Sequence, residues 1–184
     1  GKKDGRKFYT QQQLNIDETY VFYNPKAGIS YTHGGHKAYA SVAYANREPE
    51  RNNFTDNSSA ALPKPEHLFD TELGYQYRAA NWYASANLYY MRYINQFVMT
   101  GAKSDIGEAI TSNIKNSYRL GAELSTGWSP LQWLSLEGNA ALSQNKLKNF
   151  TEEVEAWDTE AVHNTYAKST LSYSPSAILN GFVD

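Results

Sequence analysis

Cysteine is missing from this sequence, and several features of soluble enzymes and nucleic-acid-binding proteins are missing with it. Without cysteine among the 184 residues, a disulfide scaffold, a cysteine zinc site and a thiol nucleophile are excluded. No apolar run approaches the roughly 20 residues that a membrane-spanning helix needs, so a helical membrane protein is excluded. The 17 Lys and Arg residues are spread thinly against 19 Asp and Glu residues. We therefore expect no nucleic-acid partner.

Tyrosine, in contrast, is abundant. The chain has 15 Tyr residues against 7 Phe and 4 Trp. A tyrosine side chain has one apolar part and one polar end, which suits it to the border between a membrane and water. The mean hydropathy of -0.65 does not argue against a membrane location. A strand of a membrane β-barrel contacts lipid with only every second residue, and its other face and its loops are polar.

Apolar and polar residues alternate along much of the chain. From Trp82 to Tyr90, the even-numbered residues are apolar or aromatic, whereas Ser85 and Asn87 lie on the other face. The same period of two recurs in residues 37–44, 72–78, 118–128 and 134–143 and, with fewer apolar residues, in 27–31 and 167–173; a further strand is expected before Ile16. The pattern predicts an all-β fold, an antiparallel up-and-down meander of about eight long strands from a larger transmembrane β-barrel.

The connections between these strands alternate between short and long. Tight turns are expected at residues 33–36, 79–81 and 129–131, and long polar loops at 48–69, 100–116 and 147–163. Ser174-Pro175-Ser176 reads as another short turn, after which a further strand is expected. Short turns at one end and long loops at the other are typical of outer-membrane barrels.

Charge is expected on one face of the strands, and this face is predicted to line the lumen, because Arg or Lys facing lipid at mid-bilayer costs about 2–4 kcal/mol. The predicted lumen-facing residues are Lys26, Glu72, Arg78, Arg119, Glu123, Glu137 and Lys168. Binding residues concentrate on loops, so we expect ligand contacts in the long loops. The candidates are Arg47, Arg51, Phe54, Asp105, Glu108 and Trp157.

No catalytic or cofactor site is predicted. His33 and His36 flank Gly34-Gly35, and a hairpin turn explains them better than a metal site, because no third ligand lies nearby in sequence. No nucleophile-elbow spacing appears in the sequence, so a serine triad with one of the histidines is not predicted. An alternative remains open at this point, namely a soluble or surface-attached β-sandwich that binds carbohydrate or protein through Trp and Tyr.

Several segments resemble the C-terminal half of the barrel of TonB-dependent receptors, particularly those of Bacteroidetes. They include NPKAGISY from Asn24, ANREPERNNF from Ala45, PKPEHLFDTELGYQYR from Pro63, WYASANLYYMRYINQFVMTG from Trp82, SYRLGAEL from Ser117, GNAALSQNKLKNFTE from Gly138 and LSYSPSAI from Leu171. The resemblance implies a location in the outer membrane of a Gram-negative bacterium and a barrel of 22 strands. It also implies a plug domain, coupling to the TonB complex, and active import of a siderophore-iron, cobalamin or glycan ligand.

The resemblance also implies that residues 1–184 are part of one barrel domain. No signal peptide, plug, TonB box or closing strand with a terminal aromatic residue is recognisable in the sequence. We therefore expect a fragment whose function belongs to a parent protein. A passive porin-like barrel is the second alternative, since a plug and a TonB box would distinguish a receptor from a pore.

Overall fold

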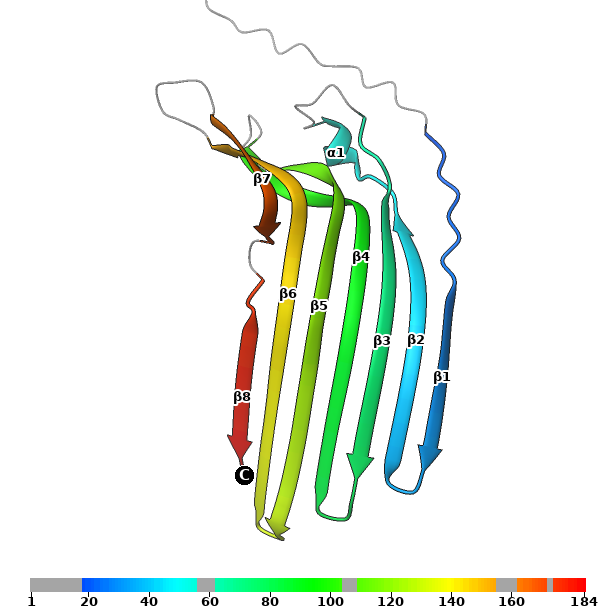
Figure 1. Cartoon of the computed structure of the whole chain (residues 1–184), viewed down its shortest axis with the longest axis vertical. Coiled ribbons are helices and arrows are strands. Elements are labelled where there is room, and N and C mark those ends of the chain that lie inside the picture. Colours follow the sequence, from blue (N-terminus) through cyan, green and yellow to red (C-terminus); the bar gives the residue numbers. More distant parts are fainter. Residues whose placement is uncertain (1–17, 56–61, 104–108, 155–161, 172–173) are drawn as a thin grey trace, which may run out of the picture.

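The structure, a computed structural model, describes residues 18–55, 62–103, 109–154, 162–171 and 174–184. These residues form one antiparallel sheet with a short helix at one end (Figure 1). The elements are β1 (Lys26–His33), β2 (His36–Arg47), α1 (Arg51–Thr55), β3 (Glu66–Arg78), β4 (Trp82–Lys103), β5 (Ala109–Leu131), β6 (Leu134–Val154), β7 (Val162–Thr170) and β8 (Ala177–Val183). The order β1 to β7 follows the chain, which confirms the predicted meander of about eight strands.

Tight turns close the hairpins at one end of the sheet, which we call the turn end; the opposite end is the loop end. His33 pairs with His36, so the two histidines flank a two-residue turn as predicted. Gly34 has a φ of 55°, a conformation that glycine adopts without strain. A Cβ atom on Gly35 would overlap the carbonyl oxygen of Arg78 in the neighbouring strand. Both glycines are therefore required by the geometry of the turn.

The pairing register separates apolar and polar side chains onto two faces. Leu73 is opposite Leu88, which is opposite Ala122, and these residues share the face that we call the apolar face. Glu72 is opposite Tyr89, and this pair lies on the other face, which we call the polar face. Because side chains alternate along a strand, a shift of the pairing by one residue would move the apolar side chains of that strand onto the polar face. The alternation of apolar and polar residues therefore fixes the register.

Two of the predicted long loops are mostly strand. β4 continues to Lys103 and β5 begins at Ala109, while β6 continues to Val154 and β7 begins at Val162. The loop predictions for residues 100–116 and 147–163 are therefore wrong over most of their length. Polar residues occupy both faces in these extensions, so the alternation that reveals a strand is absent there, although the backbone ladder continues.

The predicted turn at Ser174-Pro175-Ser176 does not reverse the chain. β7 pairs with residues 146–154 of β6, and β8 pairs with residues 136–142 of the same strand in the same antiparallel sense. β7 and β8 thus follow one path along β6, interrupted in the middle (Figure 1). Pro175 has no N–H for the ladder, and its carbonyl accepts a hydrogen bond of 2.9 Å from Oγ of Ser143 instead. The turn prediction is wrong because the proline interrupts the pairing without ending it.

The loop-end parts of the long strands bend away from the axis of the sheet (Figure 1). Asn95 in β4 has a φ of 55° and Asn149 in β6 has a φ of 54°. Asparagine tolerates this left-handed conformation better than most other residues. A single such residue turns the side chains that follow toward the opposite face. Before Asn95 the odd-numbered Tyr93 is buried, and after it the even-numbered Gln96 and Val98 are buried.

The described residues have one small hydrophobic core, which lies beneath these bends. Val98, Ile114 and Leu147 are buried, and Leu171 packs against them. Elsewhere the sheet is a single layer. Leu88 on the apolar face remains 53% exposed, because no second sheet of the described chain covers it. A sandwich needs two facing sheets, and the described residues form one sheet, so they do not form the sandwich of that alternative.

Candidate functional site

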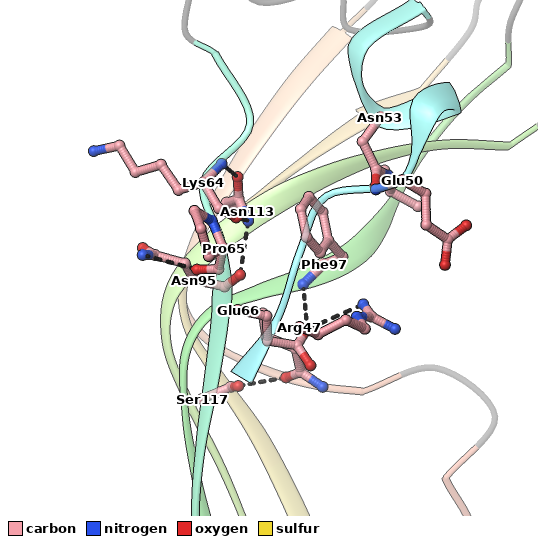
Figure 2. A network of polar contacts seen from close by, with 12 residues as sticks. Arg47, Glu50, Asn53, Lys64, Pro65, Glu66, Asn95, Phe97, Asn113 and Ser117 are labelled. Atoms are coloured by element: carbon pink, nitrogen blue, oxygen red, sulfur yellow. Dashed lines mark hydrogen bonds and ion pairs between the residues drawn. The ribbon is translucent and has the colours of Figure 1, made fainter. Parts of the chain in front are cut away.

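A network of hydrogen bonds holds α1 and the segment before β3 against the bent parts of β4 and β5 (Figure 2). The backbone N–H of Lys64 donates to Oδ1 of Asn113 at 2.8 Å. Nδ2 of Asn113 donates to the carbonyl of Lys64 at 3.0 Å and to that of Asn95 at 2.7 Å. Nδ2 of Asn53 in α1 donates to Oγ1 of Thr111 in β5 at 2.7 Å. Asn113 of β5 therefore fixes the segment before β3 to the sheet, and Asn53 fixes α1 to it.

Glu66 joins three strands at the same end. Its Oε2 lies 3.2 Å from Nη2 of Arg47 and accepts a hydrogen bond of 2.9 Å from the backbone N–H of Phe97. The guanidinium of Arg47 also lies 5.4 Å from the centre of the Phe97 ring. The Glu66 side chain is 13% exposed, whereas that of Arg47 is 52% exposed. Glu66 is therefore the buried centre of this cluster, and Arg47 covers it.

A cleft of about 210 Å³ opens beside this network. Its lining includes Asn53, Lys64, Phe97, Asn113 and Lys115. None of the described residues that line it is Asp or Glu, so Lys64 and Lys115 are the charged residues of its lining. Small-molecule sites usually enclose about 300–1,000 Å³, so this cleft is large enough for one anionic group or one part of a larger ligand.

Three of the predicted ligand-contact residues fall within the described chain, and they take different positions. Arg47 ends β2 and is engaged with Glu66. Arg51 begins α1 and is exposed, whereas Phe54 in the same helix is half-buried. The other three predicted residues, Asp105, Glu108 and Trp157, lie outside the described residues.

Sequence reasoning missed the residues that build the cleft. Lys64 and Lys115 lie in stretches that were predicted as loops, and no alternation marks them. Asn113 looks like ordinary loop sequence, because its partners are backbone groups from a segment far away in the chain. Such a pairing leaves no local signal in a single sequence.

Aromatic side chains form two rows across the apolar face. The turn-end row contains Tyr31, Tyr75, Tyr77, Trp82 and Trp128, and the loop-end row contains Tyr44, Phe69, Tyr90 and Tyr118. The Tyr77 and Trp82 rings lie 5.4 Å apart, and the Tyr90 and Tyr118 rings 6.3 Å apart. Trp82 and Tyr90 are eight positions apart in β4, which at about 3.3 Å per residue separates the rows by about 26 Å.

The polar face carries most of the charge that was assigned to it. The register places six of the seven predicted residues there: Lys26, Glu72, Arg78, Arg119, Glu123 and Glu137. Lys168 is the exception, because it is opposite Lys148 on the apolar side of the sheet. Its assignment to the polar face is wrong. Leu171, three residues further along and just after β7, packs against the buried Val98, Ile114 and Leu147 on the other side of the sheet, so the lysine faces outward.

Two charged residues of the polar face carry buried atoms that lack a partner among the described residues. These atoms are Oδ1 of Asp70 and Nε of Arg119. The guanidinium of Arg119 lies 5.3 Å from the centre of the Tyr93 ring. A hollow of about 420 Å³ in this face is lined by Arg119 together with Glu72 and Glu123. Buried polar atoms normally have partners, so this face is suited to contact another polar surface.

Three tyrosines of the polar face lie across glycines of the next strand. The pairs are Tyr39 with Gly74, Tyr89 with Gly121 and Tyr83 with Gly127. A Cβ atom on any of these glycines would overlap the tyrosine opposite it. The rings therefore lie flat against the wall and do not project from it.

Neither a metal site nor a membrane-spanning helix is found in the part of the chain that the structure describes. No three His, Asp or Glu side chains converge there in a way that could hold a metal ion. No helix in these residues is long and apolar enough to cross a bilayer.

Comparison with known proteins agrees with the fold. Residues 2–182 match the family model described as TonB dependent receptor-like, beta-barrel. A search of curated proteins finds no match. The ferric-catecholate import receptor Fiu from E. coli K12 is similar in structure, with a TM-score of 0.58, 19% identity, and coverage of 86% of this chain and 21% of that chain.

Two further solved structures are similar. The copper transporter OprC has a TM-score of 0.56 and 16% identity over 66% of this chain and 20% of that chain. The FrpB iron transporter from Neisseria meningitidis has a TM-score of 0.53 and 19% identity over 68% of this chain and 20% of that chain. At these identities the likeness concerns the fold. The chain spans about a fifth of the length of these structures.

Proposed function

Because the chain belongs to the family of TonB-dependent receptor β-barrels, we propose that it is a segment of the barrel wall of an outer-membrane receptor that captures and imports a scarce ligand. The observation that carries this proposal, beside the family match, is the apolar face. It is a single exposed layer bounded by two aromatic rows. The separation of about 26 Å between these rows is close to the apolar band of about 25 Å in outer-membrane barrels.

In this proposal the apolar face contacts lipid and the polar face lines the lumen. A cation such as Arg119 on the lipid side at mid-bilayer would cost about 2–4 kcal/mol, whereas water or protein in the lumen can solvate it. The partnerless atoms of Asp70 and Arg119 support a polar occupant of the lumen. The family suggests the plug domain of the parent for this role, with the TonB complex as the source of energy.

The loop end is proposed to face the exterior and to take part in ligand capture. Its cleft combines Lys64 and Lys115 with amide groups and the Phe97 ring. This chemistry suits an anionic ligand or an anionic part of one. The similar solved proteins are described as transporters of copper and iron and as a receptor for ferric catecholates. We therefore place a metal chelate before cobalamin or a glycan as the ligand class.

Uptake by cells tests the function of the parent protein. A strain without the parent gene is expected to lose uptake of radiolabelled iron chelates, and a strain without TonB is expected to lose it as well. Uptake that persists without TonB would favour the passive pore. Recovery of the parent protein in the soluble periplasm, and not in the outer-membrane fraction, would overturn the membrane orientation.

A second measurement tests the cleft. The double variant K64A/K115A should bind an anionic chelate about tenfold or more weakly, because each ammonium group contributes a charge-assisted contact. The Lys37→Ala variant serves as the control, since Lys37 is exposed at the turn end of the polar face. Equal affinities in all three proteins would exclude the cleft from ligand capture.

A further inference from the structure

Four basic residues lie on the apolar side of the sheet, next to the loop-end aromatic row. Arg92 is opposite Tyr118, which is opposite Lys146 on the other side. Lys148, two residues further along β6, is opposite Lys168 in β7. Arg92, Lys148 and Lys168 are exposed and Lys146 is half-buried. These four residues, which we call the basic patch, therefore occupy two adjacent rows of one face.

Among the described residues, no carboxylate neutralises the basic patch. In the described part of the two rows the other residues are neutral side chains and His67: Tyr44, Asn46, Phe69, Ile94, Asn116, Tyr118 and Thr170. None of the four basic side chains forms an ion pair with a carboxylate of the described chain. Nζ of Lys146 donates to Oγ1 of Thr170 at 2.9 Å, which satisfies a donor without removing the charge.

The pairing of Lys148 with Lys168 is unfavourable by itself. Side chains directly opposite in an antiparallel pair have Cβ atoms about 5 Å apart, and like charges at this distance destabilise the sheet. An anion that contacts both ammonium groups reverses the sign of this interaction. Phosphate suits such a position, because its several oxygen atoms can accept hydrogen bonds from two lysines at once.

The position of the basic patch along the strands, relative to the loop-end aromatic row, indicates which molecule supplies the anion. Lys148 lies one row beyond Tyr118 and Lys146, about 7 Å along the strand. In the proposed orientation the aromatic row marks the border of the hydrocarbon layer, and the phosphates of lipid headgroups lie just outside it. Lysine side chains reach such groups while their aliphatic stems cover apolar surface. The patch is on the face opposite the lumen, so an imported ligand does not contact it.

We propose that Arg92, Lys146, Lys148 and Lys168 form a binding site for the phosphate groups of lipid headgroups in the leaflet that surrounds the loop end of the barrel. The inference rests on the proposed orientation of the apolar face toward lipid. It assigns this chain a lipid-recognition function that is separate from ligand import. Clusters of Lys and Arg beside a membrane are a known basis of anionic lipid binding.

Native mass spectrometry of the full-length parent receptor tests the site. The receptor is released from mixed micelles that contain equal amounts of phosphatidylglycerol and phosphatidylcholine with identical acyl chains. The wild-type protein is expected to retain phosphatidylglycerol preferentially. In the variant K146Q/K148Q/K168Q the preference should fall about fivefold for each charge removed.

Matched variants separate charge from shape. The Lys37→Gln variant removes an exposed lysine from the polar face and should retain the lipid preference of the wild type. The variant K146R/K148R/K168R keeps the charges and should keep the preference. Equal retention of the two lipids by the wild type, or an unchanged preference in the triple glutamine variant, would overturn the proposal. Complete displacement of phosphatidylglycerol by millimolar inorganic phosphate would assign the patch to a free anion and would also overturn it.

The outcome can be separated from that of the proposed function. Folding of each variant is checked first by the shift in electrophoretic mobility on heating, which folded barrels show. A receptor that inserts into bilayers and imports its ligand without lipid preference contradicts only the basic patch. A receptor that does not enter bilayers contradicts the barrel orientation and the basic patch together.

Discussion

The hydroxyl of Tyr39 in β2 donates a hydrogen bond of 3.1 Å to Oδ1 of Asn87 in β4, although β3 lies between these strands. The bond is possible because the residue of β3 between them is Gly74, which pairs with both. The tyrosine ring lies over the glycine, where a Cβ atom would overlap it. One side chain thus links three strands across the polar face.

Replacement of Gly74 by alanine should destabilise the barrel by about 1–3 kcal/mol, because the added methyl group forces the Tyr39 ring out of its position. The free energy of unfolding of the parent barrel in detergent or lipid, measured with urea, checks this value. The Gly138→Ala variant is the control. A Cβ atom there meets only the carbonyl of Asn180 at 3.8 Å, so this variant should be as stable as the wild type or slightly more stable.

The double variant Y39A/G74A provides a further check on this interpretation. If the loss in Gly74→Ala comes from the overlap with the ring, then Gly74→Ala should cost less in the Tyr39→Ala background than in the wild type. Equal costs in both backgrounds would assign the effect to the backbone of β3.

In the cluster formed by Glu66, Arg47 and Phe97, we expect replacement of the two charged residues to lower the stability of the barrel unequally. Glu66→Ala leaves the backbone N–H of Phe97 and the guanidinium of Arg47 without their acceptor, which should cost about 1–3 kcal/mol. Arg47→Ala removes a side chain that is 52% exposed, and the loss should be about 0–1 kcal/mol. Hydrogen exchange at the Phe97 amide should accelerate strongly in the first variant and weakly in the second. The reverse order would contradict the central position of Glu66.

Alternation predicted the middle of the sheet from the sequence because consecutive side chains of a strand there face an apolar and a polar environment in turn. Leu88 and Glu123 were placed on opposite faces in this way, and the register agrees. The same rule failed at Lys168, because the apolar residue Leu171 that follows β7 packs on the polar side of the sheet and leaves the lysine on the apolar side. The turn prediction at Pro175 failed for a separate reason, because the pairing with β6 continues on the far side of the interruption.

The contacts that shape the loop end could not be predicted for another reason. Asn113 bonds to Lys64, and Asn53 bonds to Thr111, across separations of 49 and 58 residues. A single sequence carries no trace of such pairs, since asparagine is equally common in unpaired loops. The left-handed conformation of Asn95 is equally invisible, because the residue lies inside the uninterrupted strand β4.

The bend of β4 predicts how Asn95 tolerates substitution. Its φ of 55° suits glycine, so Asn95→Gly should change the free energy of unfolding by less than about 1 kcal/mol. A β-branched residue is strained there, and Asn95→Val should cost about 1–3 kcal/mol. Urea unfolding of both variants checks the difference. The side chain of Asn95 donates to the carbonyl of Pro65 at 3.5 Å, a weak bond whose loss is common to both variants.

Two neighbouring residues of β5 test the orientation on which the proposed function and the basic patch depend. Leu124 lies on the apolar face between the aromatic residues Trp128 and Tyr118, and Glu123 lies on the polar face. If lipid covers the apolar face, Leu124→Arg should cost about 2–4 kcal/mol in a bilayer, whereas Glu123→Arg should cost about 1 kcal/mol or less, because the lumen solvates the new charge. Both variants introduce the same side chain at adjacent positions, so differences in strand propensity largely cancel. Unfolding free energies of the parent barrel in phospholipid vesicles provide the measurement. A larger cost for Glu123→Arg would mean that the polar face contacts lipid and the apolar face lines the lumen. Equal costs would mean that water reaches both faces.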